Sequence, residues 1–341
     1  MWLAALMLGA VPLRQVKLDA VGDVMLARWV AKRIDREGAE SAFAGVRNEF
    51  DRADLVVGNL ECALTSAPVA VRKPIVLRAD PDKLAVLESA GFAALSLANN
   101  HSQDCGAAGV VEARRLLASA KIVPVGPSFD TVVLTRHGLR IGFIGIMDLP
   151  PIRLNRFGAW RREISRIREK TDIVVAMLHW GVEGSAKAGD AQRSLAASLA
   201  GLGVDLVLGS HPHVLQPLTW LPAPHHRRCL VAFSLGNFLF DARPGSERTS
   251  AILSVVLGPS GVVRYREIPV RIDHGFPVLG SSAARPPNRS HSAAPDHAVR
   301  PEYKVSLNAI AGSTRTASSR VLRHVSPFHA SFNGQRPRLM I

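Results

Sequence analysis

The chain has 341 residues, of which 47% are hydrophobic and 21% charged, a composition that excludes a globally disordered protein. Three scattered cysteines exclude a disulfide scaffold or a four-thiolate zinc site, and no apolar run reaches the ~20 residues that span a bilayer. The net charge of +14 favours an anionic partner. No helix-turn-helix, zinc-finger or aromatic-rich RNA-binding pattern accompanies that charge, so no nucleic acid partner is expected.

The two ends of the chain differ from its middle. Residues 1–15 begin with an apolar run, Met1 to Leu13, which is typical of the hydrophobic part of a signal peptide but lacks a basic lead-in. A signal-like segment and a segment packed on the domain both stay open there. Residues 276–341 are rich in Ser, Ala, Pro and Arg without an apolar period, which predicts a disordered basic tail. Residues 16–275 are expected to form one folded domain.

Within that domain, short apolar runs alternate with helical patterns. The runs are rich in Val, Ile and Leu, which predicts buried strands; they cover 16–26, 54–61, 92–101, 139–148, 172–180, 204–213 and 230–240. The helical patterns cover 80–91, 106–120, 161–170 and 190–203. This alternation predicts an α/β fold with a largely parallel sheet. A turn at Pro259-Ser260-Gly261 predicts a closing hairpin.

Polar side chains end six of the predicted strands. They are Asp23, Asn59, Glu61, Asn99, Asn100, His101, His179, His211, His213 and Asn237. Because the carboxyl ends of the strands line the ligand crevice in open α/β sheets, we expect these side chains to converge on one edge.

Carboxylate, amide and imidazole groups without a thiolate form a mixed N/O ligand set that suits Mn, Fe or Zn. Pro212 favours extended backbone at His211, and residues i and i+2 of an extended chain point to the same side. His211 and His213 are therefore expected to reach one cluster. Taken singly each residue is ambiguous, since His179 after an apolar run is typical of a buried, hydrogen-bonded side chain. Their recurrence at strand ends favours a shared site.

Six motifs follow one another along the chain: GDVMLAR, NLECALTS, SLANNHSQDCG, LHWGVE, GSHPHVLQPL and FSLGNFLFD. Together they resemble the CapA family of capsule-synthesis proteins, which is associated with poly-γ-glutamate and belongs to the metallophosphoesterase (calcineurin-like) superfamily. The resemblance spans roughly Val16 to Ile272. It implies a four-layer α-β-β-α sandwich with metal ligands at the strand ends.

Carried over position by position, the resemblance implies a two-metal site and one catalytic histidine. The implied metal ligands are Asp23, Asn59 or Glu61 as the bridging residue, Asn100, His179, His211 and His213. His101 matches the histidine that lies beside the substrate. Two positions depart from the superfamily pattern: Met25 replaces a histidine, and Asn59 and Glu61 replace a bridging aspartate. Because thioether and amide groups are poorer ligands for hard cations, the pattern leaves open that one metal position is weakened, altered or lost.

Two functions of different classes fit these observations. The first is metal-dependent hydrolysis of a phosphoester with two divalent ions (Mn, Fe or Zn), in which protonated His101 stabilises developing charge or protonates the leaving oxygen. The alternative is a non-catalytic, polyanion-binding component of a capsular polymer synthesis or export complex.

The expected partners are an anionic polymer or a phosphorylated envelope precursor and a membrane-bound synthesis complex. The expected location is the cell envelope rather than the cytoplasm alone. A scaffold with a vestigial site is a third hypothesis.

Overall fold

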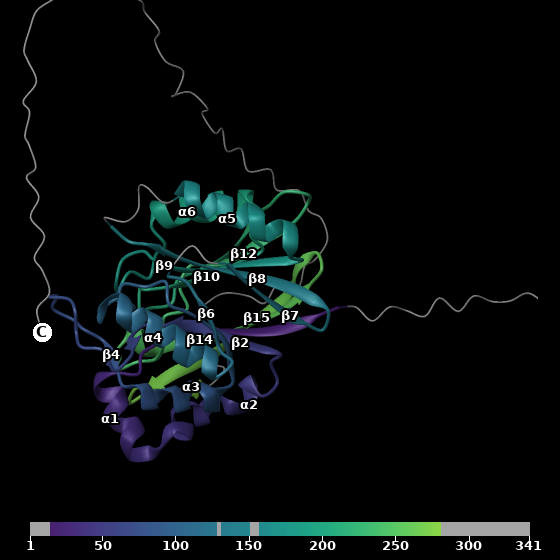
Figure 1. Cartoon of the computed structure of the whole chain (residues 1–341). Helices are drawn as coiled ribbons and strands as arrows, with labels where there is room; N and C mark the ends of the chain where they lie inside the picture. Colours follow the sequence, from purple (N-terminus) through teal and green to yellow (C-terminus); the bar gives the residue numbers. More distant parts are fainter. Residues whose placement is uncertain (1–13, 128–130, 151–156, 281–341) are drawn as a thin grey trace, which may run out of the picture. The chain divides into compact units, whose positions relative to one another are not determined.

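The computed structural model describes residues 14–127, 131–150 and 157–280 (Figure 1). Of the segment predicted at 1–15, residues 1–13 lie outside the described residues, as do residues 281–341 of the tail predicted at 276–341. In the part of the chain that is described, no helix combines the length and the apolarity needed to span a bilayer.

The first of two large sheets contains eight strands within the described residues, in the order β16-β15-β14-β1-β2-β5-β6, with β13 beside β1. The strands are β1 (Val16–Val24), β2 (Leu55–Leu60), β5 (Phe92–Ser96), β6 (Val123–Val125), β13 (Asn237–Leu239), β14 (Thr249–Gly258), β15 (Gly261–Asp273) and β16 (Phe276–Leu279). β1, β2, β5 and β6 run parallel, whereas β14 to β16 pair antiparallel. The sheet is therefore mixed, with a parallel half and an antiparallel half.

The second sheet has the order β11-β12-β10-β9-β8-β7. Its strands are β7 (Thr131–Arg136), β8 (Leu139–Asp148), β9 (Ile173–Trp180), β10 (Leu206–Ser210), β11 (Leu218–Pro222) and β12 (Arg228–Ala232). The four central strands are parallel, and β7 and β11 form antiparallel edges. A short parallel pair, β3 (Ala63–Leu64) and β4 (Arg78–Ala79), lies apart from both sheets.

Helices cover the outer face of each sheet (Figure 1). They are α1 (Arg28–Glu37), α2 (Arg47–Phe50), α3 (Leu84–Ala90), α4 (Gly106–Ser119), α5 (Phe157–Lys170) and α6 (Asp190–Gly201), with 3-10 turns η1 (Ala39–Val46), η2 (Pro81–Lys83) and η4 (Ser246–Arg248). Three apolar cores result: one between α1, α3, α4 and the first sheet, one between the two sheets, and one between the second sheet and α5 and α6. The predicted four-layer α-β-β-α arrangement is confirmed.

The core between the sheets explains where the polar strand ends point. Successive side chains of a strand alternate between its faces, so the inward row of β2 is Leu55, Val57 and Asn59. In β9 the corresponding row contains Val175 and Met177 and ends at His179. Each row is thus apolar along the strand and polar at its carboxyl end, which places the polar groups between the two sheets rather than on the edge of one.

Most predicted elements are found. The four helical patterns correspond to α3 to α6, and the hairpin joins β14 to β15 through Pro259 and Ser260. The single strand predicted at 230–240 is wrong: β12 belongs to the second sheet and β13 to the first. The chain changes sheets between them, where Gly236 takes a positive φ of 67° that a glycine adopts without strain. The start of the disordered tail predicted at residue 276 is wrong, because residues 276–279 form β16, which pairs with β15.

Candidate metal centre

Asp23 reaches the space between the sheets because β1 carries a bulge. Ala20 pairs with Val57 and Asp23 with Asn59, so two residues of β1 lie opposite one residue of β2. One extra residue reverses the alternation of side chains, which turns Asp23 to the same face as Asn59. Gly22 sits at the bulge, where a Cβ would lie 1.8 Å from the carbonyl oxygen of Gly236. Only a glycine fits this close approach.

Glu61 lies at the centre of the cluster. Its side chain is fully buried, and neither carboxylate oxygen has a hydrogen-bond partner. It belongs to two groups whose ligand atoms lie within 4.8 Å of one another, one with His211 and His213 and one with Asp23 and His179. Because buried polar atoms are almost always satisfied in folded proteins, a carboxylate with two orphaned oxygens among imidazoles fits a cation site.

Asn59 and Asn100 have different surroundings. Asn59 donates to Asp23 Oδ1 at 2.8 Å and accepts from Asn99 Nδ2 at 3.1 Å. Both ends of its amide are therefore used to hold neighbouring side chains, which favours Glu61 over Asn59 as the bridging residue. Asn100 Oδ1 instead lies 2.8 Å from His179 Nε2, inside the cluster.

His213 is oriented by Asn237. Its Nδ1 lies 2.9 Å from Asn237 Oδ1, while its Nε2 lies 3.8 Å from Glu61 Oε1. With Nδ1 donating to Asn237, Nε2 faces the carboxylate across a gap too long for a hydrogen bond, and once it has lost its proton it offers a lone pair there. A cation about 2 Å from each atom would fill that gap. Asn237 is not among the ligands that the resemblance implies; its neighbour in the sheet is Asp23, a pairing that depends on the separate strand β13.

His179 has a comparable arrangement on the other side of Glu61. Ser210 Oγ donates to the carbonyl of Leu178 and lies 3.0 Å from His179 Nδ1. In the tautomer that donates from Nδ1 to Ser210, the Nε2 lone pair faces Asn100 Oδ1 at 2.8 Å and Glu61 Oε1 at 3.6 Å. In that tautomer three acceptors converge, and a cation would satisfy all of them. Asn59 Nδ2 also lies 3.3 Å from His179 Nδ1; in the opposite tautomer Nδ1 accepts from this amide and Nε2 donates to Asn100 Oδ1.

The backbone at His211 and His213 differs from the prediction. Neither residue is extended: φ is 93° at His211 and 60° at His213, in the region that side chains other than glycine rarely adopt. The expectation that both point the same way because the chain is extended is wrong, although both rings do reach the cluster. The ring centroids lie 6.0 Å apart, and His211 Nδ1 is buried without a hydrogen-bond partner. Strained backbone of this kind concentrates at functional sites.

Met25 supplies no ligand to this cluster. Its side chain is fully buried in the apolar core beneath α1, and its sulfur accepts a hydrogen bond from the backbone N–H of Ala27. The first motif therefore contributes Asp23 alone.

Burial and mutual charge set the protonation of the cluster. Burial opposes ionisation of Asp23, but a hydrogen bond from His213 outweighs it and lowers the pKa of Asp23 to about 2. Burial and the charge on Asp23 raise the pKa of Glu61 well above its ordinary value. Burial lowers the pKa of His179 well below its ordinary value and that of His211 to about 4. The two carboxylates outweigh burial at His213 and raise its pKa to about 10. A cation must therefore displace protons from Glu61 and His213, so its affinity should rise with pH.

His101 is held beside the cluster by groups that the sequence interpretation missed. Its Nδ1 lies 2.8 Å from Asp104 Oδ2, and Asp104 Oδ1 forms an ion pair with Lys73 Nζ at 2.5 Å. The backbone N–H of Leu77 also donates to Asp104, at 2.7 Å. This carboxylate fixes the ring and leaves Nε2 free to exchange a proton. The spacing of three residues between His101 and Asp104, inside a turn, was the available sequence indication.

The Asp104 side chain should stabilise the fold in a pH-dependent way. Burial raises its pKa, but hydrogen bonds from His101 and Lys73 outweigh burial and hold the pKa below the ordinary 3.8. The stabilisation is complete above the pKa of the unfolded chain and is lost as the pH falls through the lower folded value. Asp104→Asn should cost about 1.5–3 kcal/mol of unfolding free energy at neutral pH. Urea unfolding of both proteins should show this difference stay constant down to about pH 5 and then shrink as the pH falls through 3.8 and below; a difference that stays constant throughout would contradict the ionic origin.

Comparison with known proteins gives a consistent set of relatives. The sequence profile of the family described as "Bacterial capsule synthesis protein PGA_cap" matches residues 17–242. The PGA biosynthesis protein CapA of Bacillus subtilis (strain 168) is 30% identical over 278 residues, which cover 76% of this chain and 72% of that protein. The capsule biosynthesis protein CapA of Bacillus anthracis is 28% identical over 299 residues, covering 79% and 70%. A solved structure of a novel phosphatase from Mycoplasma pneumoniae aligns with a TM-score of 0.49 at 14% identity, covering 76% of this chain and 94% of that one.

Proposed function

Since the chain belongs to the PGA_cap family of bacterial capsule synthesis proteins, we propose that it binds two divalent cations at the candidate metal centre and hydrolyses a phosphoester during the making of an anionic polymer. The family is the one predicted from the six motifs. The observation that carries the proposal is the buried carboxylate of Glu61, which has no hydrogen-bond partner and is shared by both candidate ligand groups.

The residues of the centre would divide the work as follows. Asp23 and His179 would hold one ion, and His211 and His213 would hold the other. Glu61 would contribute to both sites. Mn, Fe and Zn suit this donor set of imidazoles and carboxylates. When bound, two such ions supply an activated water and neutralise the charge on a phosphoryl group.

The chain's own groups would handle the proton and the water. His101, with Nδ1 held by Asp104, would donate a proton from Nε2 to the leaving oxygen. Burial of Glu61 and His179 keeps the centre dry, which strengthens electrostatic interactions within it. The substrate would be a phosphorylated envelope precursor, and the protein would work at the cell envelope beside a membrane-bound synthesis complex.

One observation favours a second function, that of a non-catalytic polyanion-binding component. Met25 occupies the core instead of the centre, so the centre lacks one imidazole that the superfamily pattern supplies. Stoichiometric metal with turnover of a phosphodiester would support the enzyme. Salt-sensitive binding of a polyanion without turnover would support the component.

Elemental analysis of protein purified without chelator tests the proposal. We expect about two divalent ions per chain in the wild type, and a loss of about one ion in His211→Ala. The matched control is His137→Ala, which replaces an exposed histidine 3.3 Å from Asp54. Absence of stoichiometric metal from the wild type after incubation with Mn, Fe or Zn would contradict a metal-dependent function.

A further inference from the structure

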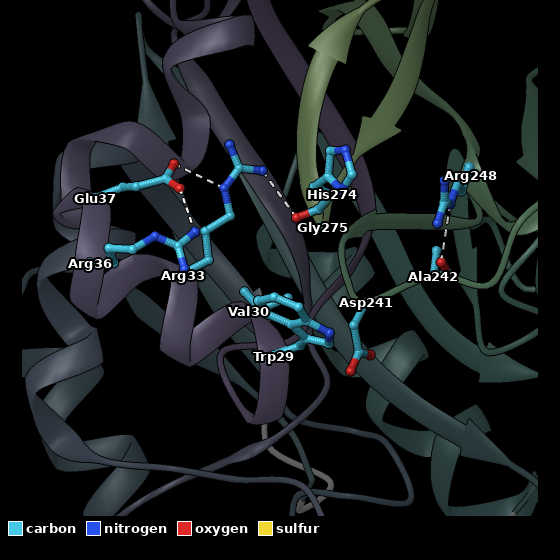
Figure 2. A pocket seen from close by; sticks show the side chains of 10 residues that line it. All are labelled: Trp29, Val30, Arg33, Arg36, Glu37, Asp241, Ala242, Arg248, His274 and Gly275. Carbon is cyan, nitrogen blue, oxygen red and sulfur yellow. Dashed lines mark hydrogen bonds and ion pairs between the residues drawn. The ribbon is translucent and has the colours of Figure 1, made fainter.

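Apart from the metal centre, a pocket lies between α1 and the segment that follows β13 (Figure 2). Its volume is about 540 Å³, within the range of roughly 300–1,000 Å³ typical of ligand sites. Trp29 and Arg36 line it from α1, and Asp241 and Arg248 line it from the segment after β13. None of these residues belongs to the candidate metal centre.

Phe240 connects the metal centre with the segment that lines the pocket. The ring centroid of Phe240 lies 5.0 Å from that of His213, and the two residues that follow Phe240 line the pocket. Arg28 contacts both Phe240 and the pocket residue Asp241, with its guanidinium carbon 5.9 Å from the Phe240 ring centroid and a terminal nitrogen 2.5 Å from Asp241 Oδ1.

Two arginines of the pocket keep donors free, whereas its acids are already paired. Arg33 is committed to Glu37 and to the backbone carbonyls of Asp273 and His274. One terminal nitrogen of Arg36 donates to the Glu37 carboxylate, and the Arg36 side chain is 61% exposed. Arg248 donates from Nε to the carbonyl of Ala242, and its two terminal nitrogens have no partner among the described residues.

An exposed aromatic side chain completes the pocket. Trp29 is 63% exposed and lies between Arg36 and Arg248 in the view of Figure 2. An indole left open to water beside unsatisfied guanidinium donors is typical of a site that binds a ligand with both apolar and anionic parts.

We propose that this pocket binds an acidic chain segment, with carboxylates on Arg36 and Arg248 and the intervening methylene groups on Trp29. The inference deepens the proposed function and rests on it for the anionic nature of the ligand. Single negative charges separated by an apolar spacer match two arginines on opposite sides of an aromatic surface. A phosphate concentrates its charge at one point and would favour donors that converge.

The test is calorimetric titration of the full chain with a γ-linked glutamate decamer. The double substitution Arg36→Gln/Arg248→Gln should weaken binding about ten-fold, since it removes two charge-assisted contacts. The control is Arg161→Gln/Arg162→Gln on α5, which changes the net charge equally on the opposite outer layer and should bind as the wild type does. Trp29→Phe should keep the affinity and abolish the fluorescence change that binding causes in the wild type.

Equal affinity of the wild type and the Arg36→Gln/Arg248→Gln protein for the decamer would overturn the proposal. The single variant Arg36→Gln changes an exposed side chain and should fold normally, so weaker binding in this variant cannot come from a folding defect. Tripolyphosphate that displaces the decamer with the same dependence on both arginines would overturn the choice of carboxylates. His211→Ala separates this proposal from the function above. If His211→Ala still binds the decamer, and this binding still depends on Arg36 and Arg248, the pocket is supported even if no turnover is found. If His211→Ala no longer binds the decamer, the binding site is the metal centre and the proposal is overturned.

Discussion

Replacing Glu61 with glutamine is expected to weaken the binding of both cations at least about 100-fold, because the carboxylate is shared by both candidate ligand groups. A glutamine keeps the volume of the side chain but offers a neutral amide. Removal of any other single ligand should leave the opposite group of residues intact. Titration of the metal-free protein with Mn or Zn, followed by calorimetry, measures the difference.

The same substitution should have little effect on the stability of the metal-free protein. Burial and the nearby Asp23 raise the pKa of Glu61 well above its ordinary value, which favours the neutral form of the side chain that the amide resembles. Added metal should then stabilise the wild type by about 2.7 kcal/mol at a hundred-fold excess over Kd and the variant by much less. Glu169→Gln, an exposed change on α5, should respond as the wild type does. A Glu61→Gln protein that gains as much as the wild type would contradict the shared role.

The clustering of the candidate ligands could be predicted because it follows from two regularities that a sequence displays. Val175, Met177 and His179 lie two residues apart, as do Val57, Asn59 and Glu61, so apolar rows that end in polar residues are visible in the order of the amino acids itself. The carboxyl ends of parallel strands then bring those residues together. Placing the site on one edge of one sheet was too simple, since β2 and β9 belong to different sheets that face each other.

Other features depend on local backbone geometry that the pattern of residues does not encode. The bulge that turns Asp23 inward adds one residue to β1 without changing its apolar character. The left-handed backbone at His211 and His213 is held by surrounding contacts and runs against the preference of both side chains. The residues that orient the ligands, such as Asn237 and Ser210, are ordinary turn or strand-end residues when viewed along the chain. Only their distances to the imidazoles reveal their part.

His101→Ala should lower the hydrolysis of a generic phosphodiester by about 10²–10⁴-fold, the usual contribution of a general acid, while the metal content stays unchanged. His101 belongs to neither candidate ligand group, and its Nδ1 is held by Asp104. Loss of turnover with full metal occupancy therefore separates a proton-transfer role from a ligand role. Asp104→Asn should reduce turnover less, because it leaves the imidazole in place but frees its orientation.

The pH dependence of that reaction provides the second readout. If His101 donates a proton to the leaving oxygen, wild-type turnover should fall at alkaline pH, and His101→Ala should lose that alkaline limb. Metal affinity moves in the opposite direction, since Glu61 and His213 must release protons to bind cations. A bell-shaped profile in the wild type that becomes a single rising limb in His101→Ala would thus assign each limb to its own set of residues. An unchanged rate and profile in His101→Ala would remove this histidine from the mechanism and leave the metal centre without an acid.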